Sequence, residues 1–243
     1  MATLQDTKEI ISRHFEVFEI NLTKAMSLEA YGPAAWRHSL NIAQMDKQKA
    51  KSLAFSDCLK WVPHLRKHML FPSETYFNEL SYFLEYKGSS TFPIFLRPCN
   101  GFKTFSGQIF SEKRLAEEVR FLQQNKNVGS DLLCMYSPAT VIAAEWRCIF
   151  IDGKYCSGSQ YMTTGHIDLS PEVPADVIAF AEAIAANPFF TNNNLTEFCV
   201  DVGRSYMKLY LIEINSFNCS SFYAADLNKI YETWAHAFTK DTN

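Results

Sequence analysis

The run Leu209-Tyr210-Leu211-Ile212-Glu213-Ile214-Asn215, preceded by Val200-Asp201-Val202, is apolar except for two acids and one amide. Side chains alternate along a β-strand, so Glu213 and Asn215 project from the same face. A turn centred on Met207 places Asp201 opposite Glu213, because both acids lie 6 residues from it. Two carboxylates and one carboxamide oxygen suit Mg²⁺, which takes one or two carboxylates together with substrate phosphates and water. The pattern predicts a magnesium–nucleotide site on a pair of strands.

The composition around this stretch is that of a globular protein. The 243 residues suffice for one large domain or two small ones, and 47% of them are hydrophobic against 20% charged. A net charge of −3 gives no electrostatic case for nucleic-acid binding. No run of about 18 apolar residues is present, and the N-terminus lacks a basic region followed by an apolar one. We expect a soluble intracellular protein with no nucleic-acid or membrane partner.

Cysteine usage supports the same expectation. The seven cysteines are scattered, with no CxxC pair and no regular framework. Such a pattern inside apolar segments is typical of reduced, buried thiols in a cytosolic protein. The positions are Cys58, Cys99, Cys134, Cys148, Cys156, Cys199 and Cys219.

Hydrophobic periodicity predicts an α+β protein with largely antiparallel sheets. Ser73 is a possible N-cap for a helix, because apolar residues follow it at helical spacing from Tyr76 to Leu84. Asp152-Gly153 is a strong signal for a hairpin turn. We expect strands at 92–98 and 132–136, hairpin strands at 141–150 and 154–161, and helices at 111–124, 174–186 and 226–238.

The order of these motifs resembles the ATP-grasp superfamily, and in particular its small, divergent phage and bacterial members. The resemblance runs from about residue 71 to residue 230. It is carried by Phe95-Leu96-Arg97-Pro98 with Lys103-Thr104-Phe105-Ser106-Gly107, by Glu145-Trp146-Arg147 with Asp152-Gly153, and by the Asp201 and Glu213–Asn215 segments. It implies an ATP-grasp domain at 71–243, with two mainly antiparallel α+β lobes sandwiching a nucleotide. Residues 1–70 would be an atypical N-terminal region, either a reduced preceding domain or a partner-binding segment.

The resemblance also implies phosphate-binding residues in the first half of the domain. Arg97 stands where many family members have a lysine, and a guanidinium can grip phosphate bidentately. Lys103, Ser106 and Gly107 lie in the loop that would close over the β- and γ-phosphates of ATP. The alternative for Arg97 is a rim charge that pairs with a carboxylate.

Further roles are implied in the second half. Glu145 becomes a candidate for a ribose or metal contact, and Arg147 for a contact to phosphate or to the substrate carboxylate. The alternative for both is a cross-strand salt bridge on a solvated face. Asn218 would orient a substrate carboxylate, although ordinary turn chemistry also explains it.

One position departs from the pattern of the family. Many ATP-grasp ligases carry an arginine two residues before the first metal-binding acid, and here that position is Cys199. Arg204 and Lys208 are the alternative sources of that charge, although Lys208 and Glu213 have opposite parity in a regular strand.

The implied activity is an ATP- and Mg²⁺-dependent carboxylate–amine ligation of the peptide or amino-acid type, through an acyl phosphate. Asp201, Glu213 and Asn215 would hold Mg²⁺. The implied partners are ATP, a carboxylate and an amine, with a protein partner or a homodimer possible, in the cytoplasm of a bacterial cell or a phage-infected host. The alternative is an ATP-binding protein without ligase activity that supports assembly or interaction with a protein partner.

Overall fold

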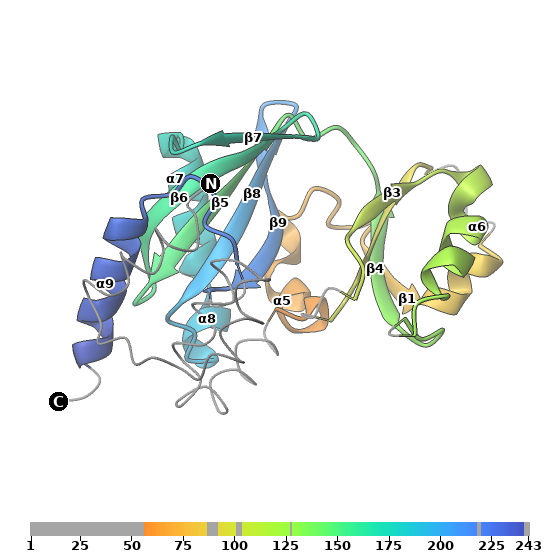
Figure 1. Ribbon diagram of the computed structural model, residues 1–243, viewed down its shortest axis with the longest axis horizontal. Helices are drawn as coiled ribbons and strands as arrows, with labels where there is room; N and C mark the ends of the chain where they lie inside the picture. Colours follow the sequence, from red (N-terminus) through yellow and green to blue (C-terminus); the bar gives the residue numbers. More distant parts are fainter. Residues whose placement is uncertain (1–55, 87–91, 101–103, 127, 218–219, 241–243) are drawn as a thin grey trace, which may run out of the picture. The chain divides into compact units, whose positions relative to one another are not determined.

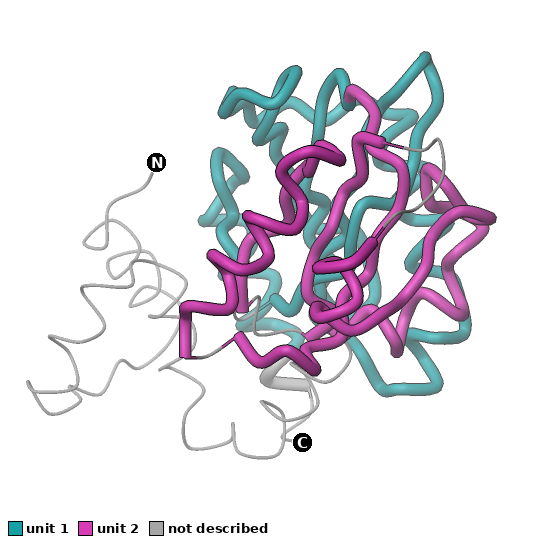
Figure 2. The backbone as a smooth tube through the Cα atoms, turned by 90° about the vertical axis from the view of Figure 1, so that its right-hand side faces the viewer, with its two compact units in different colours: residues 1–52, 142–243 teal, residues 53–141 magenta. Residues whose placement is uncertain are grey.

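The computed structural model describes residues 56–86, 92–100, 104–126, 128–217 and 220–240 (Figure 1). The chain divides into two compact units, residues 1–52 with 142–243 as unit 1 and residues 53–141 as unit 2 (Figure 2). The separate N-terminal region at 1–70 stays a prediction, and residues 1–55 lie outside the described ranges. Within those ranges, none of the helices is both long enough and apolar enough to cross a membrane.

Unit 2 is built on a four-stranded antiparallel sheet in the order β1-β4-β2-β3. Its strands are β1 (Tyr76–Glu79), β2 (Ile94–Pro98), β3 (Gln108–Phe110) and β4 (Leu133–Pro138). Its helices are α5 (Cys58–Leu65), the 3₁₀ helices η1 (Arg66–His68) and η2 (Leu80–Leu84), and α6 (Glu112–Leu122). The buried residues of α6, Leu115 and Val119, join Ile94 and Leu96 of β2 in one hydrophobic core. The predicted helix at 111–124 and the strands at 92–98 and 132–136 are therefore confirmed.

The helix predicted to start after Ser73 is wrong. Residues 76–79 form β1, which pairs with β4 so that Tyr76 lies opposite Tyr136. The 3₁₀ helix η2 follows and buries Leu80 and Phe83. A spacing of three residues between apolar positions fits one turn of a 3₁₀ helix as well as an α-helix, and pairing with β4 fixes the strand.

Unit 1 contains a five-stranded antiparallel sheet in the order β7-β6-β5-β8-β9. The strands are β5 (Ala144–Ile151), β6 (Lys154–Thr163), β7 (His166–Ser170), β8 (Phe198–Ser205) and β9 (Lys208–Ser216). The helices are α7 (Ala175–Ala185), α8 (Pro188–Asn192) and α9 (Leu227–Lys240). The β5–β6 hairpin turns at Asp152-Gly153, whose φ values of 51° and 68° fit a type I′ turn, as predicted. The mixed helices and antiparallel sheets confirm the α+β class.

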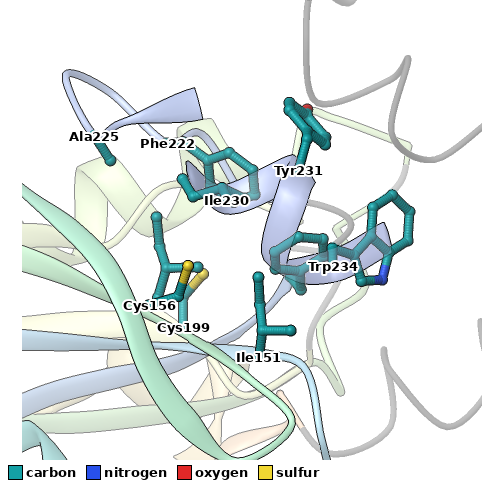
Figure 3. Packing of buried hydrophobic residues seen from close by; sticks show 10 residues of the cluster. Ile151, Cys156, Cys199, Phe222, Ala225, Ile230, Tyr231 and Trp234 are labelled. Carbon is teal, nitrogen blue, oxygen red and sulfur yellow. The ribbon is translucent and has the colours of Figure 1, made fainter. Parts of the chain in front are cut away.

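The two faces of this sheet pack against different elements. On one face, Phe198 of β8 stacks between Phe150 of β5 and Phe190 of α8. On the other face, Ile149 and Cys199 belong to a core that includes Phe217 and three residues of α9, as Figure 3 shows. The residues from α9 are Ile230, Tyr231 and Trp234.

Cysteines contribute to both units as buried, free thiols. Six of the seven are described, and all six are buried and unbridged, as predicted; Cys219 lies outside the described residues. Burial, together with the neighbouring Cys58, raises the pKa of Cys134 to about 12, so this thiol stays protonated at neutral pH.

Candidate functional site

The register of β8 and β9 brings the two predicted acids together, but the turn differs from the expected one. Asp201 lies opposite Glu213, as predicted. The connecting turn is not centred on Met207. It is a two-residue turn at Tyr206-Met207, both with positive φ (46° and 66°), and Ser205 pairs with Lys208.

A β-bulge corrects the register between the turn and the acids. Val202 pairs with Leu211, whereas Asp201 pairs with Glu213, so Ile212 is an extra residue on β9. Without this extra residue, Ile212 would lie opposite Asp201 and the side chain of Glu213 would project from the other face. The bulge therefore places Glu213 and Asn215 on the face of Asp201. It also places Lys208 on that face, so the expectation of opposite parity is wrong for this strand.

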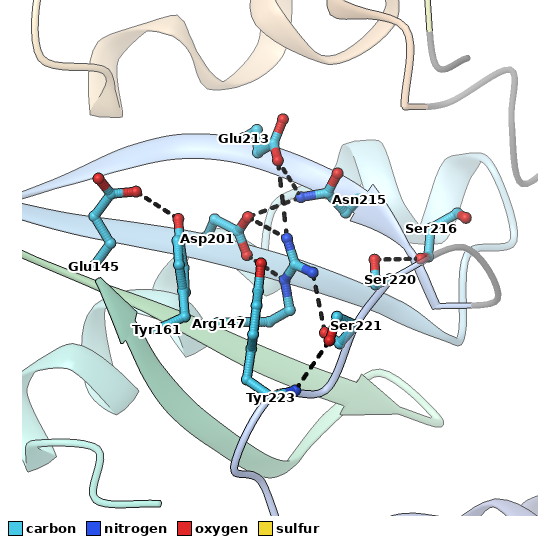
Figure 4. Close-up of polar contacts among 10 residues, drawn as sticks. All are labelled: Glu145, Arg147, Tyr161, Asp201, Glu213, Asn215, Ser216, Ser220, Ser221 and Tyr223. Atoms are coloured by element: carbon cyan, nitrogen blue, oxygen red, sulfur yellow. Dashed lines mark hydrogen bonds and ion pairs between the residues drawn. The ribbon is translucent and has the colours of Figure 1, made fainter. Parts of the chain in front are cut away.

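The acids form a closed network with Asn215 and Arg147 (Figure 4). Arg147 lies on the central strand β5 directly opposite Asp201. Its Nε donates to Asp201 Oδ1 at 2.8 Å and its Nη2 to Asp201 Oδ2 at 2.6 Å. Asn215 Nδ2 donates to Asp201 Oδ2 at 2.9 Å and to Glu213 Oε1 at 2.7 Å. The side chains of Arg147 and Asp201 are 6% and 1% exposed, so this bidentate ion pair is inside the protein.

The remaining contacts of Arg147 come from the segment after β9 and from β6. Its Nη1 donates to the carbonyl oxygen of Ser221 at 3.0 Å. Its Cζ lies 5.1 Å from the ring centroid of Tyr223 and 5.8 Å from that of Tyr161. Burial disfavours the charged guanidinium, but the opposite charge and hydrogen bonds of Asp201 outweigh it, so the pKa of Arg147 lies above its ordinary value. Arg147 is therefore a fixed positive charge.

Glu145 lies at the edge of the network, two residues before Arg147 on the same face of β5. Tyr161 donates its hydroxyl to Glu145 Oε2 at 2.6 Å. Burial raises the pKa of Glu145, the charges of Asp201 and Glu213 act in the same direction, and the hydrogen bond from Tyr161 opposes them. The cluster thus combines three carboxyl groups with one guanidinium.

The chemistry of these side chains fits a hard divalent cation. Across the described part of the chain, no three His, Cys, Asp or Glu side chains are arranged to hold a metal ion. A cation here would be held by Asp201, Glu213 and the carboxamide of Asn215, with phosphate and water as the other ligands, which is the mixture that Mg²⁺ prefers. Asp201 and Glu213 both accept from the same amide nitrogen, so the two acids and the carboxamide converge. The oxygen and nitrogen of an amide are exchanged by a simple flip of the side chain.

Two of the candidates for phosphate binding, Arg97 and Gly107, pack together in unit 2. Arg97 on β2 is buried, with 6% exposure, and lies opposite Met135 of β4. A Cβ atom on Gly107 would lie 2.6 Å from the ring of Phe95 and 3.3 Å from Arg97 Cβ, so only glycine fits this approach to β2. Ser106 is exposed beside it. Lys103 lies outside the described residues, as does Asn218 of unit 1.

The structure brings together Glu145, Arg147, Asp201, Glu213 and Asn215, and it adds residues that the sequence did not single out. These are Tyr161, Tyr223 and the carbonyl group of Ser221. The parity of Tyr161 with Ser159 on β6 could have indicated its face, but no local pattern marks Tyr223. Arg204 does not join the cluster, because its Nη2 pairs with Asp176 of α7 at 2.6 Å and its Cζ lies 5.2 Å from the ring of Trp146. A guanidinium from β5 thus neutralises Asp201, although Cys199 stands where many family members have arginine.

Comparison with known proteins agrees with this geometry. A sequence model of the ATP-grasp domain, for family 2 of one clade of the superfamily, matches residues 77–233. No curated protein matches the sequence. Among solved structures, D-cycloserine synthetase DcsG is 14% identical and aligns with a TM-score of 0.58 over 87% of this chain and 82% of its own.

Two further solved structures share the fold. A RimK-domain ATP-grasp protein from Sphaerobacter thermophilus is 13% identical, with a TM-score of 0.54 over 77% of this chain and 69% of its own. The ATP-grasp ligase PsnB, in complex with a phosphomimetic variant of its minimal precursor, Mg and ADP, is 11% identical, with a TM-score of 0.52 over 92% and 76%. The family match spans more than half of the sequence, and the α+β architecture is that of the ATP-grasp fold. The chain belongs to this ATP-grasp domain family.

Proposed function

We propose that this protein is an ATP- and Mg²⁺-dependent carboxylate–amine ligase that acts on amino-acid or peptide substrates. The observation that carries the proposal is the convergence of Asp201, Glu213 and Asn215 beside the buried guanidinium of Arg147, in a chain that belongs to an ATP-grasp family. Ligases among the proteins of similar fold support it, and one of them was solved with Mg and ADP.

The acidic side chains have distinct roles in this proposal. Asp201, Glu213 and Asn215 hold the cation. The bidentate pair with Arg147 fixes both oxygens of Asp201 in orientation before any ligand arrives, which is the kind of preorganisation that catalysis by positioning requires. When bound, Mg²⁺ supplies charge neutralisation for the phosphate oxygens of ATP.

The basic and loop residues complete the proposed site. Arg97, with Lys103, Ser106 and Gly107, contacts the phosphates of ATP, where the absence of a side chain at Gly107 allows close approach of backbone to ligand. Arg147 offsets negative charge that accumulates near Asp201. Glu145 contacts the ribose or the cation, and Asn218 orients the substrate carboxylate.

The proposed reaction needs no covalent bond to the protein. A substrate carboxylate oxygen attacks the γ-phosphorus of ATP, the bond from that phosphorus to the bridging oxygen breaks, and an acyl phosphate and ADP result. The nitrogen of the amine then attacks the acyl carbon, inorganic phosphate leaves, and the amine loses a proton. The products are an amide, ADP and phosphate.

The test begins with the melting temperature of the protein with and without Mg²⁺-ATP. Binding to the native state at a hundredfold excess over Kd stabilises by about 2.7 kcal/mol, which corresponds to a rise of about 5–10 °C for a chain of this size. We expect this rise to depend on Mg²⁺ and to disappear in Glu213→Gln. The matched control is Glu118→Gln, which changes an exposed pair with Arg114 on α6. An equal rise in Glu213→Gln and wild type would refute the assignment of the cation ligands.

A second measurement separates a ligase from an ATP-binding protein that supports a protein partner. ADP release is followed while amino acids and short peptides are supplied as carboxylate and amine. We expect release that requires both substrates. Stabilisation by Mg²⁺-ATP without ADP release from any pair would instead favour the partner-binding alternative.

A further inference from the structure

We propose that Tyr223 is a positioning residue whose ring keeps the guanidinium of Arg147 on Asp201. The inference about catalysis rests on the proposed ligase function, whereas the inference about the position of Arg147 does not. It assigns a role to the segment after β9 through its contact with the acidic cluster.

The rings of Tyr223 and Tyr161 form one aromatic wall against Arg147. They are stacked with centroids 4.9 Å apart and planes 14° apart. The guanidinium carbon lies over both rings, at 5.1 Å from Tyr223 and 5.8 Å from Tyr161. Distances below about 6 Å to a ring face give a favourable cation–π contact, and desolvation strengthens it. Tyr161 is buried and Tyr223 is half-buried, so the wall is largely shielded from water.

The segment that carries Tyr223 is anchored on both sides. Ala224 N–H donates to Ser159 Oγ at 3.1 Å and Asp226 N–H donates to Ser157 Oγ at 3.2 Å, so both hydroxyls of β6 hold its backbone. On the other side, the carbonyl oxygen of Ser221 accepts from Arg147 Nη1. Tyr223 itself has a φ of 51°, a conformation that L residues rarely adopt outside such a fixed turn. The ring is therefore delivered to Arg147 by a backbone held from three directions.

This placement decides between two acidic partners of Arg147. Nη2 is 2.6 Å from Asp201 Oδ2 and 3.9 Å from Glu213 Oε1. Rotation of the guanidinium towards Glu213 would break its coplanar, bidentate geometry with Asp201 and lift it from the ring of Tyr223. The ring therefore favours Asp201 as the partner and leaves Glu213 to act as a cation ligand. Loss of the ring should allow exchange of Arg147 between the two acids.

The test compares Tyr223→Phe, which keeps the ring, with Tyr223→Ala and Tyr223→Asn, which remove it. Asparagine is included because it tolerates positive φ and keeps the turn. Tyr206→Asn, at an 83% exposed turn tyrosine with a φ of 46°, is the control for loss of a tyrosine as such. The first readout is hydrogen exchange of the Arg147 Nε–H by NMR in the ligand-free protein, identified by its loss in Arg147→Lys.

We expect exchange to be about tenfold faster in Tyr223→Ala and Tyr223→Asn, and unchanged in Tyr223→Phe and Tyr206→Asn. With substrates, the same two variants should lose about tenfold in kcat with little change in KM for ATP. Equal exchange in Tyr223→Asn and wild type, or a Tyr223→Phe variant as affected as Tyr223→Ala, would overturn the proposal. Because the exchange measurement needs no nucleotide, it stands even if wild type shows no ligase activity, a result that would refute only the proposed function.

Discussion

Replacement of Arg147 by methionine tests whether the centre of the cluster is a buried ion pair. The substitution removes the guanidinium and keeps most of the side-chain volume. It leaves Asp201, which is 1% exposed, without its positive partner, and it leaves Glu213 close by. Removing one partner of a buried pair costs about 3–5 kcal/mol, because the remaining charge stays desolvated and uncompensated. For a chain of this size, we expect the melting temperature to fall by about 6–20 °C.

The assay is urea unfolding at neutral pH, followed by circular dichroism, on a double-mutant cycle of Arg147→Met and Asp201→Asn. We expect the double variant to be more stable than Arg147→Met alone, because it no longer buries that unpaired carboxylate. The matched control is Arg114→Met, which breaks an exposed pair with Glu118 and should cost less than about 1 kcal/mol. Equal losses in Arg147→Met and Arg114→Met, or strict additivity in the cycle, would show that the pair is not the buried, coupled element described above.

Two further perturbations test the surroundings of the proposed site. In Gly107→Ala, the new Cβ meets the ring of Phe95 at 2.6 Å, so we expect overpacking to cost about 1–3 kcal/mol in urea unfolding. The control is Gly153→Ala, which has no atom within 4 Å and only the strain of a φ of 68°; a greater loss there than at Gly107 would contradict the packing argument. For Glu145, burial raises the pKa of its carboxyl group in the folded protein, so the folded state binds that proton more tightly than the unfolded state. Stability should therefore fall as pH rises from the ordinary value of 4.5 through the raised value, and Glu145→Gln should flatten this part of the stability profile; an unchanged profile would argue against the burial of a titrating carboxyl group.

Local patterns in the sequence predicted much of the fold of unit 1. The β5–β6 hairpin follows from Asp152-Gly153 between two apolar runs, and helix α7 follows from an alanine-rich periodic segment. Each of these signals is contained within about 20 residues. Strand β1 was mistaken for a helix because its identity depends on β4, more than 50 residues away.

The candidate site shows the same division. The alternation along β9 places Glu213 and Asn215 on one face whatever the rest of the chain does. The partner of Asp201 could not be chosen in the same way, because Cys199, Arg204, Lys208 and Arg147 all stand at positions that a different register would favour. Arg147 lies 54 residues from Asp201, and only the pairing of β5 with β8 brings them together.

The sequence by itself determined the membership of the chain in its family, the α+β class and the two acids and the amide that converge on one face. These depend on residue identity and on the period of a strand, both of which are local. Only the tertiary structure decided the turn at Tyr206-Met207, the bulge at Ile212 and the enclosure of Arg147 by Asp201, Ser221 and Tyr223. The physical reason is that burial and electrostatic pairing depend on which distant segments exclude water from a side chain, and no local pattern carries that information.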